Sequence, residues 1–115
     1  MNLFRHSTDC VSFAPGETIF TEGELGNVAY GVQEGEVDIV LHGNVVDTAG
    51  PGSIIGEMAL IDSMPRSASA VAHTQCKLVV VDEKRFTALV QQTPYFSLHV
   101  MKLMAERLRR YMASS

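Results

Sequence analysis

The first two thirds of the chain consist of short apolar or alternating runs, each of which ends at turn residues. The runs occupy residues 11–13, 18–21, 28–32, 37–41, 45–46, 54–55, 67–72 and 77–81, and glycine, proline or asparagine stands between most of them. Short strands with such punctuation are typical of a sandwich or barrel. The pattern therefore predicts a mainly β fold over about 10–82, a jelly-roll barrel of the double-stranded β-helix type.

The hydrophobic period changes after Asp82. Asp82 is suited to cap a helix over about 83–92, and Thr93 with Pro94 is suited to start another helix over about 94–112. In this last helix an apolar stripe is predicted to pack against the barrel. Its members are Met101, Met104, Leu108 and Tyr111, widened by Phe96, Val100 and Leu103.

Length and charge limit the functional classes. The 115 residues fit a single domain, 1–115, with no linker or second domain expected after Ser115. With 9 basic and 13 acidic residues the net charge is −4, which disfavours direct binding to nucleic acid. No apolar run is long enough to span a membrane, and residues 1–6 lack the apolar core of a signal peptide. Cys10 and Cys76 form no CxxC motif, so we expect small buried residues in a reducing, cytoplasmic compartment.

One stretch, GEMALIDSMPRSASA at residues 56–70, carries the candidate chemistry. Gly56 lets the backbone approach a ligand, and Glu57 can accept hydrogen bonds from hydroxyl groups. A turn of helix after Glu57 would present backbone N–H groups to an anion, and Arg66 has the planar fork that suits phosphate. The combination indicates a sugar-phosphate site. The simpler alternatives are a surface salt bridge for Arg66 and a carboxylate that stabilises a helix start for Glu57.

The same stretch resembles the phosphate-binding cassette of the cyclic nucleotide-binding domain family, and the resemblance extends over roughly Phe13–Arg110. This family includes regulatory subunits of cyclic-nucleotide-dependent kinases, channel gating domains and bacterial regulators of the catabolite activator type. The resemblance implies that Glu57 accepts the ribose 2′-hydroxyl and that the Gly56 backbone lies against the sugar. It also implies that the backbone N–H groups of Met58 and Ala59, together with Arg66, bind the phosphate.

Several neighbouring residues receive secondary roles. Ser67 can donate to the phosphate or to the purine edge, and it leaves the choice between cAMP and cGMP open. Val45, Val46 and Ile54 are expected in the core, and the resemblance adds that some of them line the base. Leu60 and Ile61 are expected to anchor the cassette turn in the core. Ile55 stands where many family members have an aromatic residue, which puts the fine geometry of the ligand in question.

The last helix and the histidines complete the inventory. By resemblance the helix can close over the base or pair with its twin in a homodimer, and Arg107 is a candidate lid residue that stacks on the purine. The simpler interpretation of Arg107, Arg109 and Arg110 is a solvated helix end. His6, His42, His73 and His99 are scattered, so neither a metal cluster nor a nucleophile–base pair is expected.

The sequence therefore predicts a non-enzymatic sensor that binds cAMP, with cGMP as the other ligand considered, and that needs no cofactor. Ligand binding is expected to move the last helix, which would signal to an effector protein of unknown identity. Two alternatives stay open. One is a ligand-free protein-interaction module of the same fold. The other is the sensing half of a catabolite activator-like regulator that lacks its DNA-binding domain.

Overall fold

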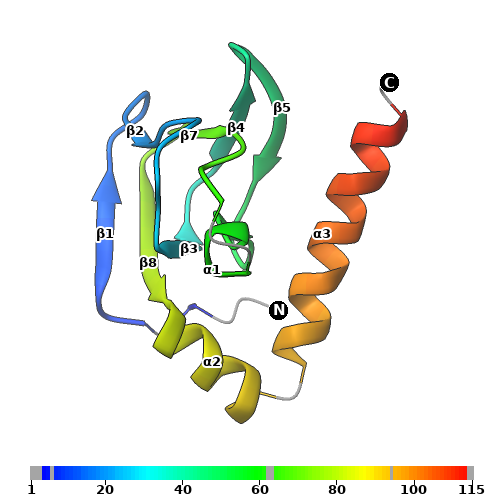
Figure 1. Ribbon diagram of the computed structural model, residues 1–115. Helices are drawn as coiled ribbons and strands as arrows, with labels where there is room; N and C mark the ends of the chain where they lie inside the picture. Colours follow the sequence, from blue (N-terminus) through cyan, green and yellow to red (C-terminus); the bar gives the residue numbers. More distant parts are fainter. Residues whose placement is uncertain (1–3, 6, 62–63, 94, 114–115) are drawn as a thin grey trace. The chain divides into compact units, whose positions relative to one another are not determined.

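A computed structural model describes residues 4–5, 7–61, 64–93 and 95–113, with no side-chain description for 110–113. Eight strands lie in the described residues between Cys10 and Asp82 (Figure 1). They are β1 (Cys10–Phe13), β2 (Thr18–Phe20), β3 (Val28–Glu34), β4 (Val37–Leu41), β5 (Asn44–Ala49), β6 (Ile54–Ile55), β7 (Ser69–Ala72) and β8 (Cys76–Asp82).

The strands form two four-stranded sheets, in the orders β1-β8-β3-β6 and β2-β7-β4-β5, and all the described pairs are antiparallel. The β4–β5 hairpin closes at Leu41↔Asn44, with His42 (φ 51°) and Gly43 (φ 82°) between them. Two positive φ values are characteristic of the type I′ turn, whose twist matches a hairpin. The mainly β, jelly-roll architecture predicted from the sequence is confirmed.

A single core cluster joins the two sheets. Val32 and Leu78 come from one sheet, and Val37 and Ala70 come from the other; none of them is exposed. Residues two apart on a strand share a face. On β8, however, Val79 is as fully buried as Leu78, so this strand is covered on both faces. Burial on both faces explains the unbroken apolar run that the sequence shows here.

The remaining elements are the helices α1 (Met58–Ile61), α2 (Glu83–Gln92) and α3 (Phe96–Ala113). The bounds of α2 match those predicted, whereas α3 begins at Phe96, and Pro94 lies outside the described residues. The chain divides into two compact units, Met1–Glu83 and Lys84–Ser115. Among the described helices none is long and apolar enough to cross a membrane.

The apolar stripe predicted for the last helix is partly wrong. Phe96 and Val100 are buried, and the Phe96 ring meets Phe86 edge-on at 5.3 Å between centroids. Met101 and Leu108 are exposed instead, 58% and 59%. The buried face of α3 therefore contains Phe96 and Val100, at i and i+4, and not Met101 and Leu108. Tyr111, another predicted member of the stripe, has no described side chain.

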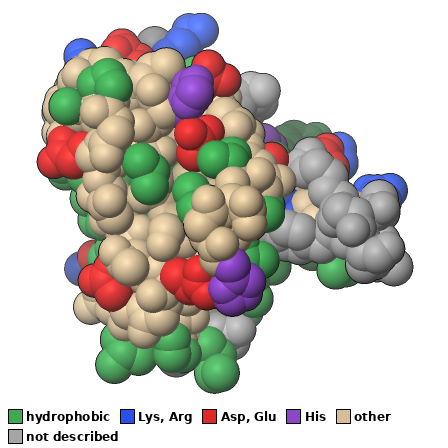
Figure 2. Space-filling view, turned by 90° about the horizontal axis from the view of Figure 1, so that it is seen from above, with side chains coloured by type: hydrophobic (Ala, Val, Ile, Leu, Met, Phe, Trp, Pro, Cys, Tyr) green, Lys and Arg blue, Asp and Glu red, His purple; other side chains and the backbone are tan. Residues whose placement is uncertain are grey.

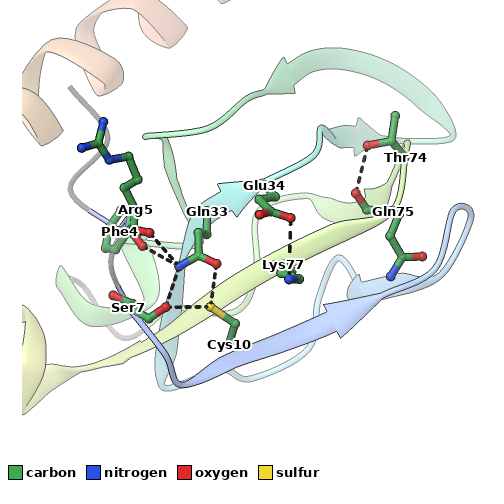
Figure 3. Close-up of polar contacts among 9 residues, drawn as sticks. All are labelled: Phe4, Arg5, Ser7, Cys10, Gln33, Glu34, Thr74, Gln75 and Lys77. Carbon is green, nitrogen blue, oxygen red and sulfur yellow. Dashed lines mark hydrogen bonds and ion pairs between the residues drawn. The ribbon is translucent and has the colours of Figure 1, made fainter.

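The segment before β1 is fastened to β3. Phe4 is 2% exposed, and its ring lies where a Cβ on Gly31 would have to stand. The Gln33 amide Nε2 donates to the carbonyls of Phe4 and Ser7, at 2.7 Å each, and the Cys10 thiol donates to Gln33 Oε1 at 3.2 Å (Figure 3). Cys10 is therefore only half-buried and hydrogen-bonded, contrary to the expected full burial.

Cys76 is fully buried, as predicted, and its thiol donates to the carbonyls of Glu36 and Thr74, both at 3.2 Å. Burial raises the pKa of this thiol, because desolvation disfavours the thiolate. Both cysteines are free.

Surface charge is mixed. On the face shown in Figure 2 acidic side chains are scattered among apolar and neutral atoms, while lysine and arginine lie at the margins. His42 lies 3.5 Å from Glu22, and His73 lies 3.0 Å from Asp38. Within the described parts of the chain no three His, Cys, Asp or Glu side chains gather as a metal site would require.

Candidate functional site: a buried arginine behind a glycine-glutamate turn

The backbone of Arg66 is fixed by the loop that follows β2. Its N–H donates to the Glu24 carbonyl at 2.7 Å, and its carbonyl accepts from the Gly23 N–H at 2.8 Å. Nearby, the Glu22 N–H donates to the Ser69 hydroxyl at 2.8 Å. These bonds join two segments that are far apart in the sequence, and they determine where the Arg66 side chain begins.

The guanidinium of Arg66 bridges two carbonyl groups. Nη1 donates to the Gly56 carbonyl at 3.1 Å, and Nη2 donates to the Val28 carbonyl at 2.8 Å. The carbon Cζ lies 4.2 Å from the centroid of the Phe20 ring. Arg66 therefore connects the cassette, the first residue of β3 and the last residue of β2.

Arg66 is a buried cation with neutral hydrogen-bond partners. It is 8% exposed, and among the described residues no ion pair of Arg66 is found. Desolvation lowers the pKa of its guanidinium, and electrostatic interactions with Tyr30 and Glu24 oppose this shift without cancelling it. Since burying a charge is costly unless it is compensated, an anion at this position would supply the missing counter-charge. The salt-bridge alternative for Arg66 is therefore not realised in the described residues.

Gly56 and Glu57 form the turn that leads into α1. Gly56 has φ 71°, and a Cβ here would lie 2.6 Å from Arg66 Nη1, so both the backbone and the neighbouring cation require glycine. Glu57 is 3% exposed. The turn closes through the Ala59 N–H, which donates to the Gly56 carbonyl at 3.3 Å, and the Leu60 N–H, which donates to the Glu57 carbonyl at 3.0 Å. Gly56 therefore accepts from both the turn and Arg66.

The other predicted site residues are spread out. Met58 is 46% exposed and Ala59 is buried. Ser67 is exposed and precedes β7, which starts at Ser69 rather than at Ser67. Arg107 is half-buried on α3, in the second unit.

Four of the predicted core positions are wrong or only partly right. Val45 is 58% exposed and Ile61 is 56% exposed, so neither is a core residue, and Val46 and Leu60 are half-buried. On β5 the ladder shifts register between the Ile39 and Val40 pairs, where Val45 lies opposite Val40. An irregularity of this kind places the side chains of two consecutive valines differently from a regular strand. Ile54 and Ile55 are both buried, as expected of Ile54.

Two residues beside Arg66 were missed by the sequence reasoning. Phe20 underlies the guanidinium, and a Cβ added to Gly26 would overlap the guanidinium atoms. Nothing in their spacing relates them to Arg66, because the contact arises from the pairing of the post-β2 loop with the Arg66 backbone. The only available signal was the glycine in the Leu25-Gly26-Asn27 turn, which is equally typical of an ordinary turn.

The fold is a jelly roll with a buried arginine beside a glycine-glutamate turn. Residues 10–93 match the family model described as the cyclic nucleotide-binding domain. The chain belongs to this family.

Relatives of known role are regulators of two kinds. The chain is 31% identical over 105 residues to the CRP-like cAMP-activated global transcriptional regulator of Mycobacterium tuberculosis, covering 87% of this chain and 47% of the relative. It is 40% identical over 75 residues to the cAMP-dependent protein kinase regulatory subunit of Eremothecium gossypii, covering 65% and 16%. The chain thus spans about half or less of the length of these curated relatives.

A similar solved structure comes from a protein of a different class, an enzyme. The cAMP-bound form of the EAL enzyme Bd1971 superposes with a TM-score of 0.66 at 31% identity, covering 90% of this chain and 29% of that one. The shared domain therefore occurs within longer proteins whose other parts differ.

The space at Gly26 is testable without a ligand. Gly26→Ala places a methyl group against the Arg66 guanidinium, so we expect the free energy of unfolding to fall by about 1–3 kcal/mol. Urea denaturation followed by circular dichroism measures this change. Gly50→Ala is the matched control, because nothing lies within 4 Å of its Cβ position, and a change within about 0.5 kcal/mol is expected. Equal stabilities for the two variants would contradict the close approach.

Proposed function

We propose that the chain is a non-enzymatic sensor of a cyclic nucleotide, with cAMP favoured over cGMP. The observation that carries the proposal is the buried Arg66 guanidinium, which has carbonyl and aromatic partners but no carboxylate ion-pair partner among the described residues. The printed names of the relatives, cAMP-activated and cAMP-dependent, support cAMP as the ligand.

The cyclic phosphate binds where Arg66 now meets the Gly56 carbonyl. A guanidinium has five N–H donors, and two of them are committed to the carbonyls of Gly56 and Val28. A phosphate recruits donors of the fork in a bidentate, charge-assisted arrangement. The backbone N–H groups of Met58 and Ala59 and the Ser67 hydroxyl complete the anion site. Ala59 gives up its long 3.3 Å bond to Gly56 for this purpose.

Glu57 accepts the ribose 2′-hydroxyl, and the Gly56 backbone lies against the sugar. Val46 and the exposed Val45 on β5, with Ile54 on β6, lie beside the base. Because Ile54 is 1% exposed, its part is to support this wall rather than to present a large contact area.

Ligand binding couples the cassette to β3 through the same guanidinium. Arg66 ties the Gly56 carbonyl to the Val28 carbonyl, so a phosphate that takes over its donors changes both attachments at once. The ligand can shift the conformation only to the extent that it binds one arrangement better than the other.

The direct test is titration calorimetry of the purified domain with cAMP and with cGMP. We expect a Kd in the micromolar range or tighter for the preferred ligand, roughly −8 kcal/mol or better. Arg66→Ala should abolish measurable binding, and Arg66→Lys should weaken binding by at least about tenfold, because an ammonium has no planar fork.

In the same titration the Glu57→Ala substitution should lower the affinity for cAMP but leave the affinity for 2′-deoxy-cAMP unchanged. Each variant is compared with the parent by thermal unfolding to confirm that it is folded. If neither nucleotide gives heat at millimolar concentration, the sensor proposal fails, and the ligand-free interaction module becomes the better account.

The last helix receives the signal, with Arg107 stacking on the purine. Arg107 is half-buried whereas Arg109, on the same helix, is exposed. We therefore expect Arg107→Ala to weaken nucleotide binding by roughly 3- to 30-fold, the range of a cation–π contact. Arg109→Ala removes an equal charge and should leave the affinity unchanged. An affinity that drops equally in both variants would indicate a general charge effect and remove Arg107 from the site.

The exposed apolar residues of α3 favour a homodimer. Leu98, Met101 and Leu108 are exposed, and they are separated by three and seven residues, as along a coiled-coil seam. Sedimentation equilibrium should show that the parent protein is a dimer and that the Met101→Glu variant is a monomer. The control variant Lys102→Glu, at the neighbouring exposed position, should remain a dimer. A parent protein that stays monomeric at about 100 times the concentration used for binding would remove this proposal.

The effector that responds to the domain is another part of the protein that contains it. Regulators of transcription, a kinase subunit and an EAL enzyme all contain the shared domain. The alternative that this chain is the sensing half of a catabolite activator-like regulator therefore stays open beside the kinase-subunit and enzyme types.

A further inference from the structure

We propose that Phe20 is the positioning residue of the anion-binding arginine, which it holds through the face of its ring. The inference deepens the proposed function and rests on it, since it concerns the same anion site. It names a residue, a contact and a consequence for affinity.

The geometry is a cation stacked on an aromatic ring. Arg66 Cζ lies 4.2 Å from the Phe20 centroid, within the range of a favourable cation–π contact. The Phe20 ring is stacked in turn on Tyr30 of β3, at 6.2 Å and 23° between ring planes. Phe20 also lies 3.1 Å from the Cβ position of Gly56, so the same ring touches the cassette turn.

A phenyl ring is suited to this task because it has no hydrogen-bonding atom. It occupies the face of the guanidinium, whereas the N–H donors lie in the plane of the fork. A carboxylate partner would neutralise the charge and occupy those donors. The ring does neither, so Arg66 keeps its charge, and the N–H donors that the carbonyls of Gly56 and Val28 do not occupy stay open to the phosphate.

The burial of the site strengthens the contact. Arg66 is 8% exposed, and cation–π contacts gain strength when both partners are desolvated. The hydrogen bonds to the carbonyls of Gly56 and Val28 lie in the plane of the guanidinium, and the Phe20 ring covers its face, so the three contacts together hold the fork in one orientation. A ligand that meets a preoriented fork loses less side-chain entropy on binding.

The first experiment examines the stack in the ligand-free protein. Nitrogen-edited NMR of the Arg66 Nε–H should show a resonance shifted upfield by the ring current of Phe20. Phe20→Leu should remove that shift. Phe13→Leu is the matched control, because Phe13 packs against the same core cluster but has no described contact with Arg66. An Arg66 resonance that Phe20→Leu leaves in place overturns the stack.

The second experiment grades the strength of the ring without changing its size. Phenylalanine with one, two and three fluorine atoms is introduced at position 20 by nonsense suppression, and cAMP affinity is measured by calorimetry. Each fluorine withdraws electrons from the ring face, so affinity should fall stepwise, to a total of roughly 5- to 30-fold. A ring that serves only as packing would give the same affinity across the series, and that result overturns the proposal.

Inorganic phosphate separates this inference from the proposed function. If the parent binds no cyclic nucleotide, the sensor proposal fails, and the Arg66 Nε–H resonance is titrated with inorganic phosphate instead. Phosphate binding that weakens along the fluorine series supports the role of Phe20 at an anion site of another kind. A phosphate response that is absent, or unchanged along the series, overturns it.

Discussion

The charge of Arg66 is the constraint on which the site depends. A guanidinium at 8% exposure must be surrounded by acceptors, and here they are the carbonyls of Gly56 and Val28 and the face of Phe20. These neutral partners satisfy the geometry of the cation without cancelling its charge. The domain thus keeps an electrostatic requirement that an anionic ligand can meet better than the protein does.

The β framework makes that burial possible. Arg66 leads into β7, the strand between β2 and β4, and its backbone is paired with residues 23 and 24. The two-sheet core behind it, with Val32 and Leu78 fully buried, gives the cassette a rigid support. A Cβ on Gly26 or Gly56 would stand against the Arg66 guanidinium, so that side chain would have to shift, and Gly56 also has φ 71°, which favours glycine. The paired strands therefore fix the backbone of Arg66, and the two glycines leave room for its side chain.

In the proposed sensor the same arrangement would couple ligand binding to several elements. The partners of Arg66 come from the end of β2, the start of β3 and the turn before α1, so one guanidinium contacts all three segments. A ligand that replaces a carbonyl as acceptor changes the attachment of a strand and of a turn together. Relatives of the chain include a transcriptional regulator and a kinase regulatory subunit.

The sequence by itself determined the strand-rich fold, the bounds of α2 and the family, because these depend on local periodicity, turn residues and a contiguous motif. The assignment of Gly56, Glu57 and Arg66 to a ligand site comes from the same contiguous motif and stays a prediction. Only the tertiary structure decided that Val45 and Ile61 are exposed, that Phe96 and Val100 form the buried face of α3, and that Phe20 and Gly26 surround Arg66. Such facts arise from the register of strands and the pairing of distant loops, and no pattern of neighbouring residues encodes them.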